Sequence, residues 1–193
     1  AYRRQRQMCI RDRHLLSSDF ASSFERNQRW TIRQFFNIKM KMKKKINCFI
    51  PFGTPEDTMQ TVKELQVSEL VNKIYLLGSE PGKKALPGCE YLSVKGFYST
   101  DTMKTIAANA NTEYTLFYLK QTPLKLGLYA LERMVQIMEN DKKNGIVYAD
   151  HYQLINGELK QAPVIDYQLG SVRDDFDFGS MLLFSSSAFT KIA

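Results

Sequence analysis

Residues 114–135, YTLFYLKQTPLKLGLYALERMV, decide the fold class of this chain. The run YTLFYL is continuously apolar, as expected for a strand that is buried on both faces of a parallel sheet. A turn containing Pro123 follows, and apolar residues then recur at helical spacing from Leu128 to Met138, which places Leu128 on the apolar face. The pattern predicts a helix within 123–145, with Gly145 as its stop. A buried strand that leads through a short turn into an amphipathic helix is the repeating unit of an α/β domain.

The same alternation of strands and helices extends in both directions along the chain. Thr54 is a suitable helix N-cap, Pro55 fits the first helical position, and Asn156-Gly157 is a strong two-residue hairpin signal. The pattern predicts strands at 46–52, 73–79, 89–94 and 114–119, helices at 54–71, 99–111 and 123–145, and two further strands within 146–167. We therefore expect an α/β domain with a mostly parallel sheet flanked by helices, to which the late hairpin adds an antiparallel edge.

Charge divides the chain into two parts. Residues 1–45 hold 13 Lys or Arg against 3 Asp or Glu, whereas the other 148 residues hold 14 against 17. A nucleic-acid interface needs basic residues clustered on a folded face, and no such cluster follows residue 45. We therefore assign 1–45 to a basic leader and 46–193 to the folded domain, and expect no nucleic-acid partner for that domain. Binding of nucleic acid by the leader alone stays open as a weaker hypothesis.

The leader and the cysteines bear on location. Residues 1–13, AYRRQRQMCIRDR, resemble a translated sequencing adapter, so the natural start is expected near Met40 or Met42. The basic run at 39–45 is typical of a solvated linker, although a basic amphipathic segment can also associate peripherally with an anionic membrane. Three widely spaced cysteines match no zinc or disulfide pattern, and no run reaches the roughly 18–20 apolar residues of a membrane span. These features favour a cytoplasmic protein without a transmembrane segment.

Five segments within 46–193, taken in order, resemble the nucleotide-sugar half of family 2-like glycosyltransferases, which have the GT-A fold. They are CFIPFGTPEDTMQTVKEL, KIYLLGSE, YTLFYLKQTPLKLGLYALERMV, GIVYADHYQLINGE and DFDFGSMLLFSSSAF. The resemblance implies transfer of a sugar from a nucleotide-sugar donor to a glycan or lipid-linked acceptor, with inversion, in cell-surface polysaccharide synthesis. It also implies a domain truncated at its C-terminus. The family's catalytic base would lie beyond Ala193, so this chain alone is expected to be inactive.

The chain departs from this family at the metal site. Leu119, Lys120 and Gln121 stand where the family carries its DxD aspartates, which hold Mg²⁺ or Mn²⁺ against the donor phosphates. Leu and Lys offer no hard oxygen ligand, so we expect no metal there, and Mg²⁺ or Mn²⁺ held elsewhere stays open. Lys120 can instead present a cation to the diphosphate, and the alternative is a solvent-exposed lysine in a loop. The resemblance thus implies a donor site of Pro51, Gly53, Thr54, Glu80, Lys120 and Gln121.

A second candidate site is the charged stretch SVRDDFDFGS at 171–180. Arg173 can pair with a phosphate through two hydrogen bonds. Asp174 and Asp175 can orient an acceptor hydroxyl, or hold a metal together with Asp150. The alternative is an Arg–Asp ion-pair loop that orders the chain ahead of a strand.

Two smaller features have structural alternatives as well. Asp150 and His151 are adjacent and could do acid–base work or bind metal, although neighbouring strand residues point to opposite faces. Thr54, with Glu56 and Asp57, is equally explained as plain helix capping. The missing DxD motif also favours a second hypothesis for the whole chain, a catalytically inactive GT-A-fold binding or scaffold protein.

Overall fold

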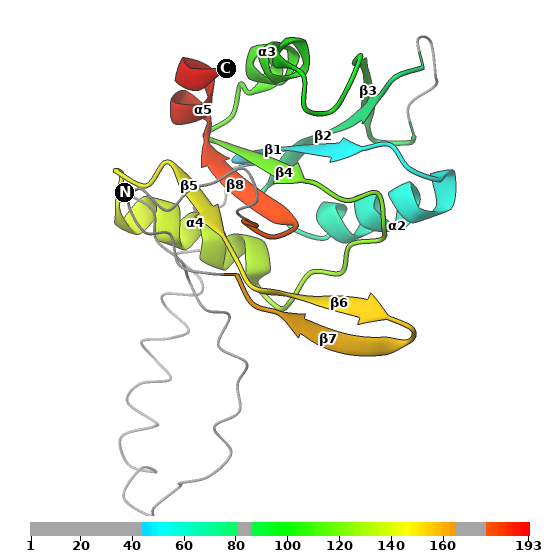
Figure 1. Cartoon of the computed structure of the whole chain (residues 1–193). Helices are drawn as coiled ribbons and strands as arrows, with labels where there is room; N and C mark the ends of the chain where they lie inside the picture. The colour runs from blue at the N-terminus through cyan, green and yellow to red at the C-terminus, as the bar shows by residue number, and fades with distance from the viewer. Residues whose placement is uncertain (1–43, 81–85, 165–176) are drawn as a thin grey trace, which may run out of the picture. The chain divides into compact units, whose positions relative to one another are not determined.

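Strands and helices alternate along residues 44–80, 86–164 and 177–193, which the computed structural model describes (Figure 1). In chain order the elements are β1 (Ile46–Pro51), α2 (Pro55–Gln66), β2 (Val71–Gly78), β3 (Glu90–Ser93), α3 (Thr100–Asn109), β4 (Tyr114–Tyr118), α4 (Ala130–Asn140), β5 (Ile146–Tyr148), β6 (His151–Ile155), β7 (Glu158–Ala162), β8 (Met181–Ser185) and α5 (Ser186–Ile192). The fold includes Lys45, one residue before the boundary suggested by the sequence. Its N–H donates to the carbonyl of Leu70, and its carbonyl accepts from the N–H of Tyr114.

Six strands form one sheet in the order β3-β2-β1-β4-β8-β5. β1 pairs in parallel with both β2 and β4, and β2 pairs in parallel with β3. β8 is antiparallel to its two neighbours, β4 and β5. The predicted α/β fold with a mostly parallel sheet and an antiparallel hairpin is therefore confirmed.

The place of the hairpin differs from the prediction. β6 and β7 form the expected hairpin around Asn156 and Gly157, both at positive φ, but they make a separate two-stranded sheet. The antiparallel member of the main sheet is β8 instead. Leu183 of β8 is fully buried, whereas nearly every residue of the hairpin is exposed. The hairpin offers no apolar strand to bury inside the main sheet, and β8 does.

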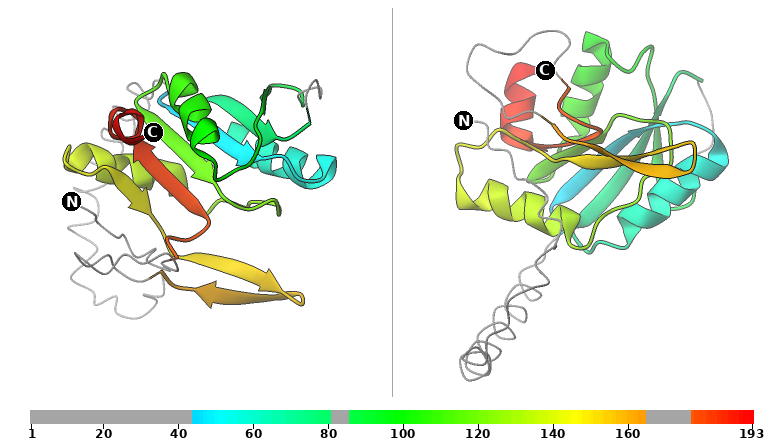
Figure 2. Two further views of the ribbon diagram at one scale, coloured as in Figure 1. Left: turned by 45° about the horizontal axis from the view of Figure 1, so that its top comes forward. Right: turned by 60° about the horizontal axis from the view of Figure 1, so that its bottom comes forward.

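Helices cover both faces of the main sheet. Figures 1 and 2 show α2 and α4 on one side and α3 and α5 on the other. Successive strand residues alternate between these two layers. Phe49, Tyr75 and Phe117 pack on the α3–α5 side with Ile106 and Phe189, and the ring centroids of Phe49 and Tyr75 are 4.8 Å apart. The continuous apolar strands of the sequence are thus explained by burial on both faces.

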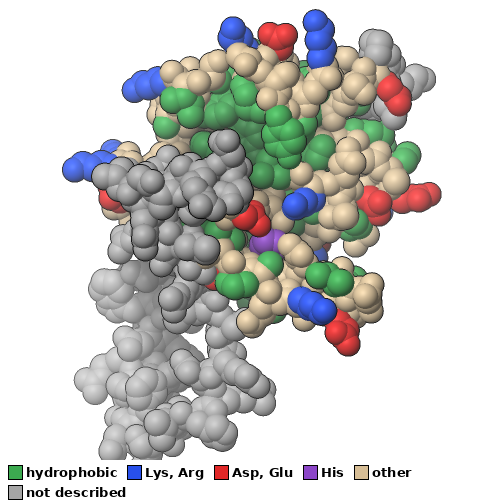
Figure 3. Space-filling view, viewed as in Figure 1, with side chains coloured by type: hydrophobic (Ala, Val, Ile, Leu, Met, Phe, Trp, Pro, Cys, Tyr) green, Lys and Arg blue, Asp and Glu red, His purple; other side chains and the backbone are tan. Residues whose placement is uncertain are grey.

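Hydrophobic side chains on the α3–α5 side are not all fully covered. Leu92, Phe97, Met103, Leu182 and Phe184 pack against the core cluster but remain partly exposed. Figure 3 shows hydrophobic side chains gathered on this face beside α3 and α5.

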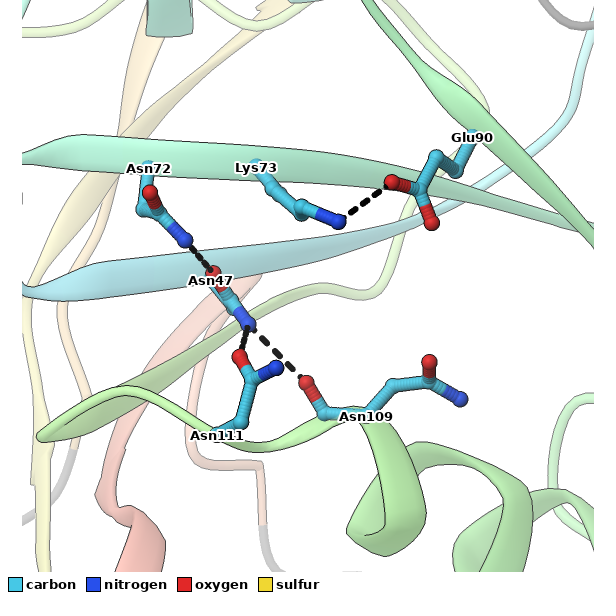
Figure 4. A network of polar contacts seen from close by, with 6 residues as sticks. All are labelled: Asn47, Asn72, Lys73, Glu90, Asn109 and Asn111. Carbon is cyan, nitrogen blue, oxygen red and sulfur yellow. Dashed lines mark hydrogen bonds and ion pairs between the residues drawn. The ribbon is translucent and has the colours of Figure 1, made fainter.

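A buried asparagine, Asn47, links the beginnings of β1, β2 and β4 to the end of α3 (Figure 4). Asn47 has no exposed surface, and its amide nitrogen donates to the Asn109 carbonyl at 2.9 Å and to Asn111 Oδ1 at 2.7 Å. Its Oδ1 accepts from the Asn72 amide at 3.0 Å. The register between β1 and β2 shifts at this point, because Ile46 pairs with Val71 and Asn47 with Lys73. The shift leaves Asn72 outside the ladder register, and its side chain reaches Asn47.

Two helices are shorter than the sequence pattern predicted. α4 begins at Ala130 rather than near Pro123, because Tyr129 has a left-handed backbone with φ of 56°. Leu128, which helical spacing placed on the apolar face, is 83% exposed. The helix ends at Asn140, so Gly145 is not its stop.

α2 ends at Gln66 instead of continuing to residue 71. A turn follows, in which the N–H of Val71 donates to the Ser68 carbonyl, and β2 starts at Val71. Leu70 is buried, and it belongs to this turn rather than to the helix. The Leu70 carbonyl receives the N–H groups of Lys45 and Ile46, which attaches the turn to the start of β1.

Candidate functional site

The strand order places a topological switch point between β1 and β4. From β1 the chain moves outward through β2 to β3, and it then returns across the sheet to pair β4 with the other side of β1. The turns that leave the carboxyl ends of β1 and β4 run to helices on the same side, α2 and α4. In open α/β sheets, ligands usually bind outside the carboxyl ends of the strands where the strand order reverses. The candidate residues Pro51, Gly53, Lys120 and Gln121 lie there.

The two turns at the switch point touch each other at Gly53. A Cβ on Gly53 would lie 2.8 Å from the Gln121 carbonyl oxygen and 3.2 Å from Gln121 Cβ. The Gln121 amide also lies 3.4 Å from the Phe52 carbonyl, at the outer limit of a hydrogen bond. Glycine at position 53 is therefore required by the close approach of the two backbones. This contact brings together residues that are about 70 positions apart in the sequence.

The segment that follows β4 is fixed at several points. The Leu119 N–H donates to the Ser180 carbonyl at 2.9 Å, and the Tyr118 hydroxyl donates to the Thr122 carbonyl at 2.9 Å. Further along, the N–H of Leu124 donates to Thr61 Oγ1 at 3.0 Å and that of Leu126 to Glu64 Oε1 at 2.9 Å. The segment therefore runs along α2 in a defined conformation rather than starting a helix.

The three residues at the DxD positions have different surroundings. Leu119 is partly buried against the core cluster on the α3–α5 side, so it belongs to the hydrophobic core. Lys120 and Gln121 are exposed. Among the described residues, no carboxylate forms an ion pair with Lys120. An exposed ammonium with no ion-pair partner, at the carboxyl edge of a sheet, is free to meet an anionic ligand.

Tyr118 closes β4 just before these residues. Burial raises the pKa of the Tyr118 phenol, and its hydrogen bond to Thr122 lowers that pKa by less. The phenol therefore stays neutral at physiological pH and keeps donating its proton to the Thr122 carbonyl. It serves to hold the turn that carries Lys120.

Thr54 is the N-cap of α2, and its hydroxyl forms hydrogen bonds within the first turn of that helix. Thr54 Oγ1 accepts from the Asp57 N–H at 3.2 Å and donates to Asp57 Oδ2 at 2.7 Å. The neighbouring Gly53 N–H donates to Thr58 Oγ1 at 3.1 Å. The first turn of α2 thus satisfies these groups internally, and the capping interpretation of Thr54 and Asp57 is confirmed.

Aromatic side chains that the sequence did not single out lie beside the switch point. Phe52 follows Pro51 at the end of β1, and its ring meets that of Tyr91, from β3, edge-to-face at 6.1 Å. A Cβ on Gly78 would lie 2.2 Å from the Tyr91 hydroxyl, so this ring packs directly over the end of β2. Both rings are partly exposed. Phe52 and Tyr91 meet because of the order of the strands in the sheet, and no local sequence pattern links positions 52 and 91.

Glu80 lies two residues beyond the end of β2 and is exposed. It is at the same carboxyl edge as the other candidates, because β1 and β2 run in parallel. The structure therefore gathers Pro51, Gly53, Glu80, Lys120 and Gln121 at one edge of the sheet, and it uses Thr54 to cap α2.

The second candidate cluster lies mostly outside the described residues. This applies to Arg173, Asp174 and Asp175. Asp177, at the edge of the same stretch, is exposed, and its Oδ1 accepts from the Gly179 N–H at 2.7 Å. Phe178 makes an edge-to-face contact with Tyr148 at 5.3 Å. The described end of this stretch thus orders the chain ahead of β8.

Asp150 and His151 are both partly buried where the hairpin leaves the main sheet. Asp150 Oδ1 accepts from the Val164 N–H at 2.7 Å, which joins the two chain segments at the base of the hairpin. His151 Nε2 lies 3.1 Å from the Gln153 amide nitrogen, and its Nδ1 is buried with no hydrogen-bond partner in the described chain. These contacts give Asp150 a structural role.

Among residues 44–80, 86–164 and 177–193, no group of three or more His, Cys, Asp or Glu side chains is placed to hold a metal ion. Within these residues there is also no helix with the length and hydrophobicity needed to cross a membrane.

A separate depression of about 270 Å³ lies at the opposite end of the strands. Gln66, Ser68 and Asn72 line it, together with the start of β2. It holds none of the candidate residues and lies away from the switch point. We therefore place the site at the carboxyl edge on the strength of the topology and the residues gathered there.

No protein-family model, no curated protein and no solved structure matches the chain.

Proposed function

We propose that residues 46–193 form a nucleotide-sugar-binding domain of the family 2-like glycosyltransferase type, with its donor site at the β1/β4 switch point. The observation that carries the proposal is the contact between the β1 and β4 turns at Gly53 and Gln121, with the exposed Lys120 beside it. The same position in the sheet is where α/β folds bind nucleotides. The order of elements that resembles this family supports the proposal independently.

Each part of the donor has a candidate partner at this edge. The ammonium of Lys120 would neutralise the diphosphate, because a charge-assisted hydrogen bond to phosphate is strong and needs no metal ion. The partly exposed rings of Phe52 and Tyr91 offer a stacking surface for the base. Glu80, which is exposed at the same edge, would accept hydrogen bonds from the base or ribose. Binding is therefore expected to be independent of a divalent metal at residues 119–121.

The test is calorimetric titration of the full chain with UDP and UDP-sugars, with Mn²⁺ or with EDTA. We expect measurable binding, with a dissociation constant that changes less than twofold when EDTA is added. Lys120→Ala should weaken it about tenfold, the value of one lost charge-assisted hydrogen bond of roughly 1.4 kcal/mol. Lys125→Ala is the matched control, because Lys125 is also exposed on the same segment but lies five residues further from the switch point.

A second pair of variants tests the contact between the β1 and β4 turns. Gly53→Val places a branched side chain where even a Cβ would meet the Gln121 carbonyl at 2.8 Å, so the two turns must separate and donor binding should be lost. Gly96→Val is its control, since a Cβ on Gly96 meets no atom within 4 Å. Equal effects of Lys120→Ala and Lys125→Ala, or no binding of any nucleoside diphosphate at millimolar concentration, would refute the proposal. Mn²⁺-dependent binding abolished by Asp174→Ala would move the site to the charged stretch.

The competing hypothesis is a non-catalytic domain of the same fold. It is favoured by the residues at 119–121, which provide neither of the two aspartates that would hold a metal ion. The two hypotheses differ in a product assay. Release of UDP from a UDP-sugar in the presence of acceptor glycans supports the transferase, and donor binding without any turnover by the longest available form of the protein supports the binding module.

A further inference from the structure

The β6–β7 hairpin carries apolar side chains that nothing in the described chain covers. Leu154 and Leu159 are 70% and 72% exposed, and they are directly opposite each other in the ladder. Directly paired residues of an antiparallel ladder point to the same face, so the two leucines form one apolar pair on one side of the hairpin. A lone two-stranded hairpin is marginally stable in water, and this one exposes its apolar pair as well.

Within residues 44–80, 86–164 and 177–193, no strand covers the outer edge of β7. Among the described residues β7 pairs with β6 alone. In Figures 1 and 2 (left) β6 lies between β7 and the rest of the domain, so β7 is the outer strand. The two-residue turn makes Ile155 and Glu158 the closing pair, and hydrogen-bonding directions alternate along an antiparallel strand. The N–H and C=O groups of Leu159 and Gln161 therefore face the open edge.

β7 carries one acidic and one basic residue, which are complementary to those of a second copy of β7. Glu158 and Lys160 flank Leu159 and point to the opposite face. If a second β7 pairs antiparallel about a two-fold axis through Leu159, each Glu158 is opposite the Lys160 of the other copy. The pairing of Leu159 with its own copy extends the leucine pair into a row of four across four strands. Both features follow from a single register.

We propose that a second copy of this chain docks on the open edge of β7, in antiparallel register centred on Leu159. The interface is isologous, as expected of a two-fold dimer, and joins two hairpins into one four-stranded sheet. The interface is small, and the dimer is therefore expected to be weak, on the order of 10–100 μM. The proposal does not depend on the function of the switch-point site.

The experiment is sedimentation equilibrium of the full chain from about 5 to 500 μM in low salt. Glu158→Lys and Lys160→Glu each place like charges opposite one another at two positions, so each should weaken dimerisation about tenfold. The double variant Glu158→Lys/Lys160→Glu restores opposite charges in this register and should dimerise as the natural chain does. An equimolar mixture of the two single variants should form a heterodimer more strongly than either forms a homodimer.

Two controls keep the outcome specific. Lys191→Glu changes an exposed charge on α5, outside the hairpin, and should have no effect. Circular dichroism should show that the variants keep the secondary structure of the natural chain. A monomer at every concentration overturns the proposal. Dimerisation that the single variants do not weaken, or that the double variant does not restore, also overturns it and assigns association to another surface, such as the hydrophobic α3–α5 face.

Discussion

Asn47 provides a quantitative test of how the parallel strands are held together. Replacing Asn47 by Ala removes three hydrogen bonds from a side chain that is fully buried. At about 1 kcal/mol net for each bond, the loss of unfolding free energy is about 3 kcal/mol. The abandoned partners on Asn72, Asn109 and Asn111 lie in half-buried or exposed residues, so water can reach them and the cost should not rise far above this value. For a domain with roughly 5–15 kcal/mol in total, this is a large fraction of the stability.

The assay is urea unfolding of the full chain, followed by circular dichroism in the far ultraviolet. Asn72→Ala leaves the buried Oδ1 of Asn47 without its hydrogen-bond donor and should cost about 1–3 kcal/mol of unfolding free energy. Asn111→Ala also removes one bond, from an exposed residue, and should cost about 0.5–1 kcal/mol. The slope of free energy against urea concentration should be unchanged, because the compactness of the folded and unfolded states is not altered.

Asn47→Asp separates polarity from the specific pattern of donors and acceptors. The aspartate can still accept from the Asn72 amide, but it brings a carboxylate to the Asn109 carbonyl and to Asn111 Oδ1, where Asn47 donates two protons. It should therefore destabilise the domain at least as much as Asn47→Ala at neutral pH. If Asn47→Ala costs less than about 1 kcal/mol, or if Asn47→Asp is neutral, the network does not stabilise the strands as argued.

Two further perturbations follow from backbone geometry and burial. Gly179→Ala should lower the free energy of unfolding by about 2–3 kcal/mol, because φ is +86° and the new Cβ would lie 3.1 Å from the Ala149 carbonyl oxygen. Gly157→Ala, at φ +83° in open space, should lower it by about 1 kcal/mol. Equal losses of free energy in urea unfolding would contradict the packing argument. Burial raises the pKa of the Tyr114 phenol in the folded state, and Glu113 and Glu139 raise it further, so the folded protein keeps a proton that the unfolded chain loses above about pH 10. The stability from this group is thus present below pH 10 and lost as the pH rises; Tyr114→Phe should make the alkaline loss of stability shallower, and an unchanged pH dependence would contradict this.

Much of the fold was predictable from local signals. The continuous apolar run at 114–118, the Thr54–Pro55 helix start and the Asn156-Gly157 turn each act over a few residues and are found where they were predicted. Helix ends were predicted less well. The spacing of Leu128 fits a helical apolar face, but the segment before α4 is held along α2 by Thr61 and Glu64, which are far away in the sequence.

The candidate site shows the same division. The loops that carry Gly53, Glu80 and Lys120 could be placed at strand ends from the sequence, since turn residues follow apolar runs. The contact between Gly53 and Gln121 and the pairing of Phe52 with Tyr91 depend on the strand order, which no local pattern encodes. Leu119 was aligned with a DxD position of the family, and only the structure shows that it packs against the hydrophobic core.

The sequence by itself determined the fold class, the four parallel strands from β1 to β4, the cap of α2 and the hairpin turn, because propensity, burial pattern and turn chemistry act over short distances along the chain. Only the tertiary structure decided that β4 returns to the free side of β1 and that β8, rather than the hairpin, is the antiparallel member of the main sheet. It also decided that β7 pairs with β6 alone among the described residues. The physical reason is that a strand's own residues fix how much of it is buried, whereas its neighbours are chosen by the packing of all the apolar faces together.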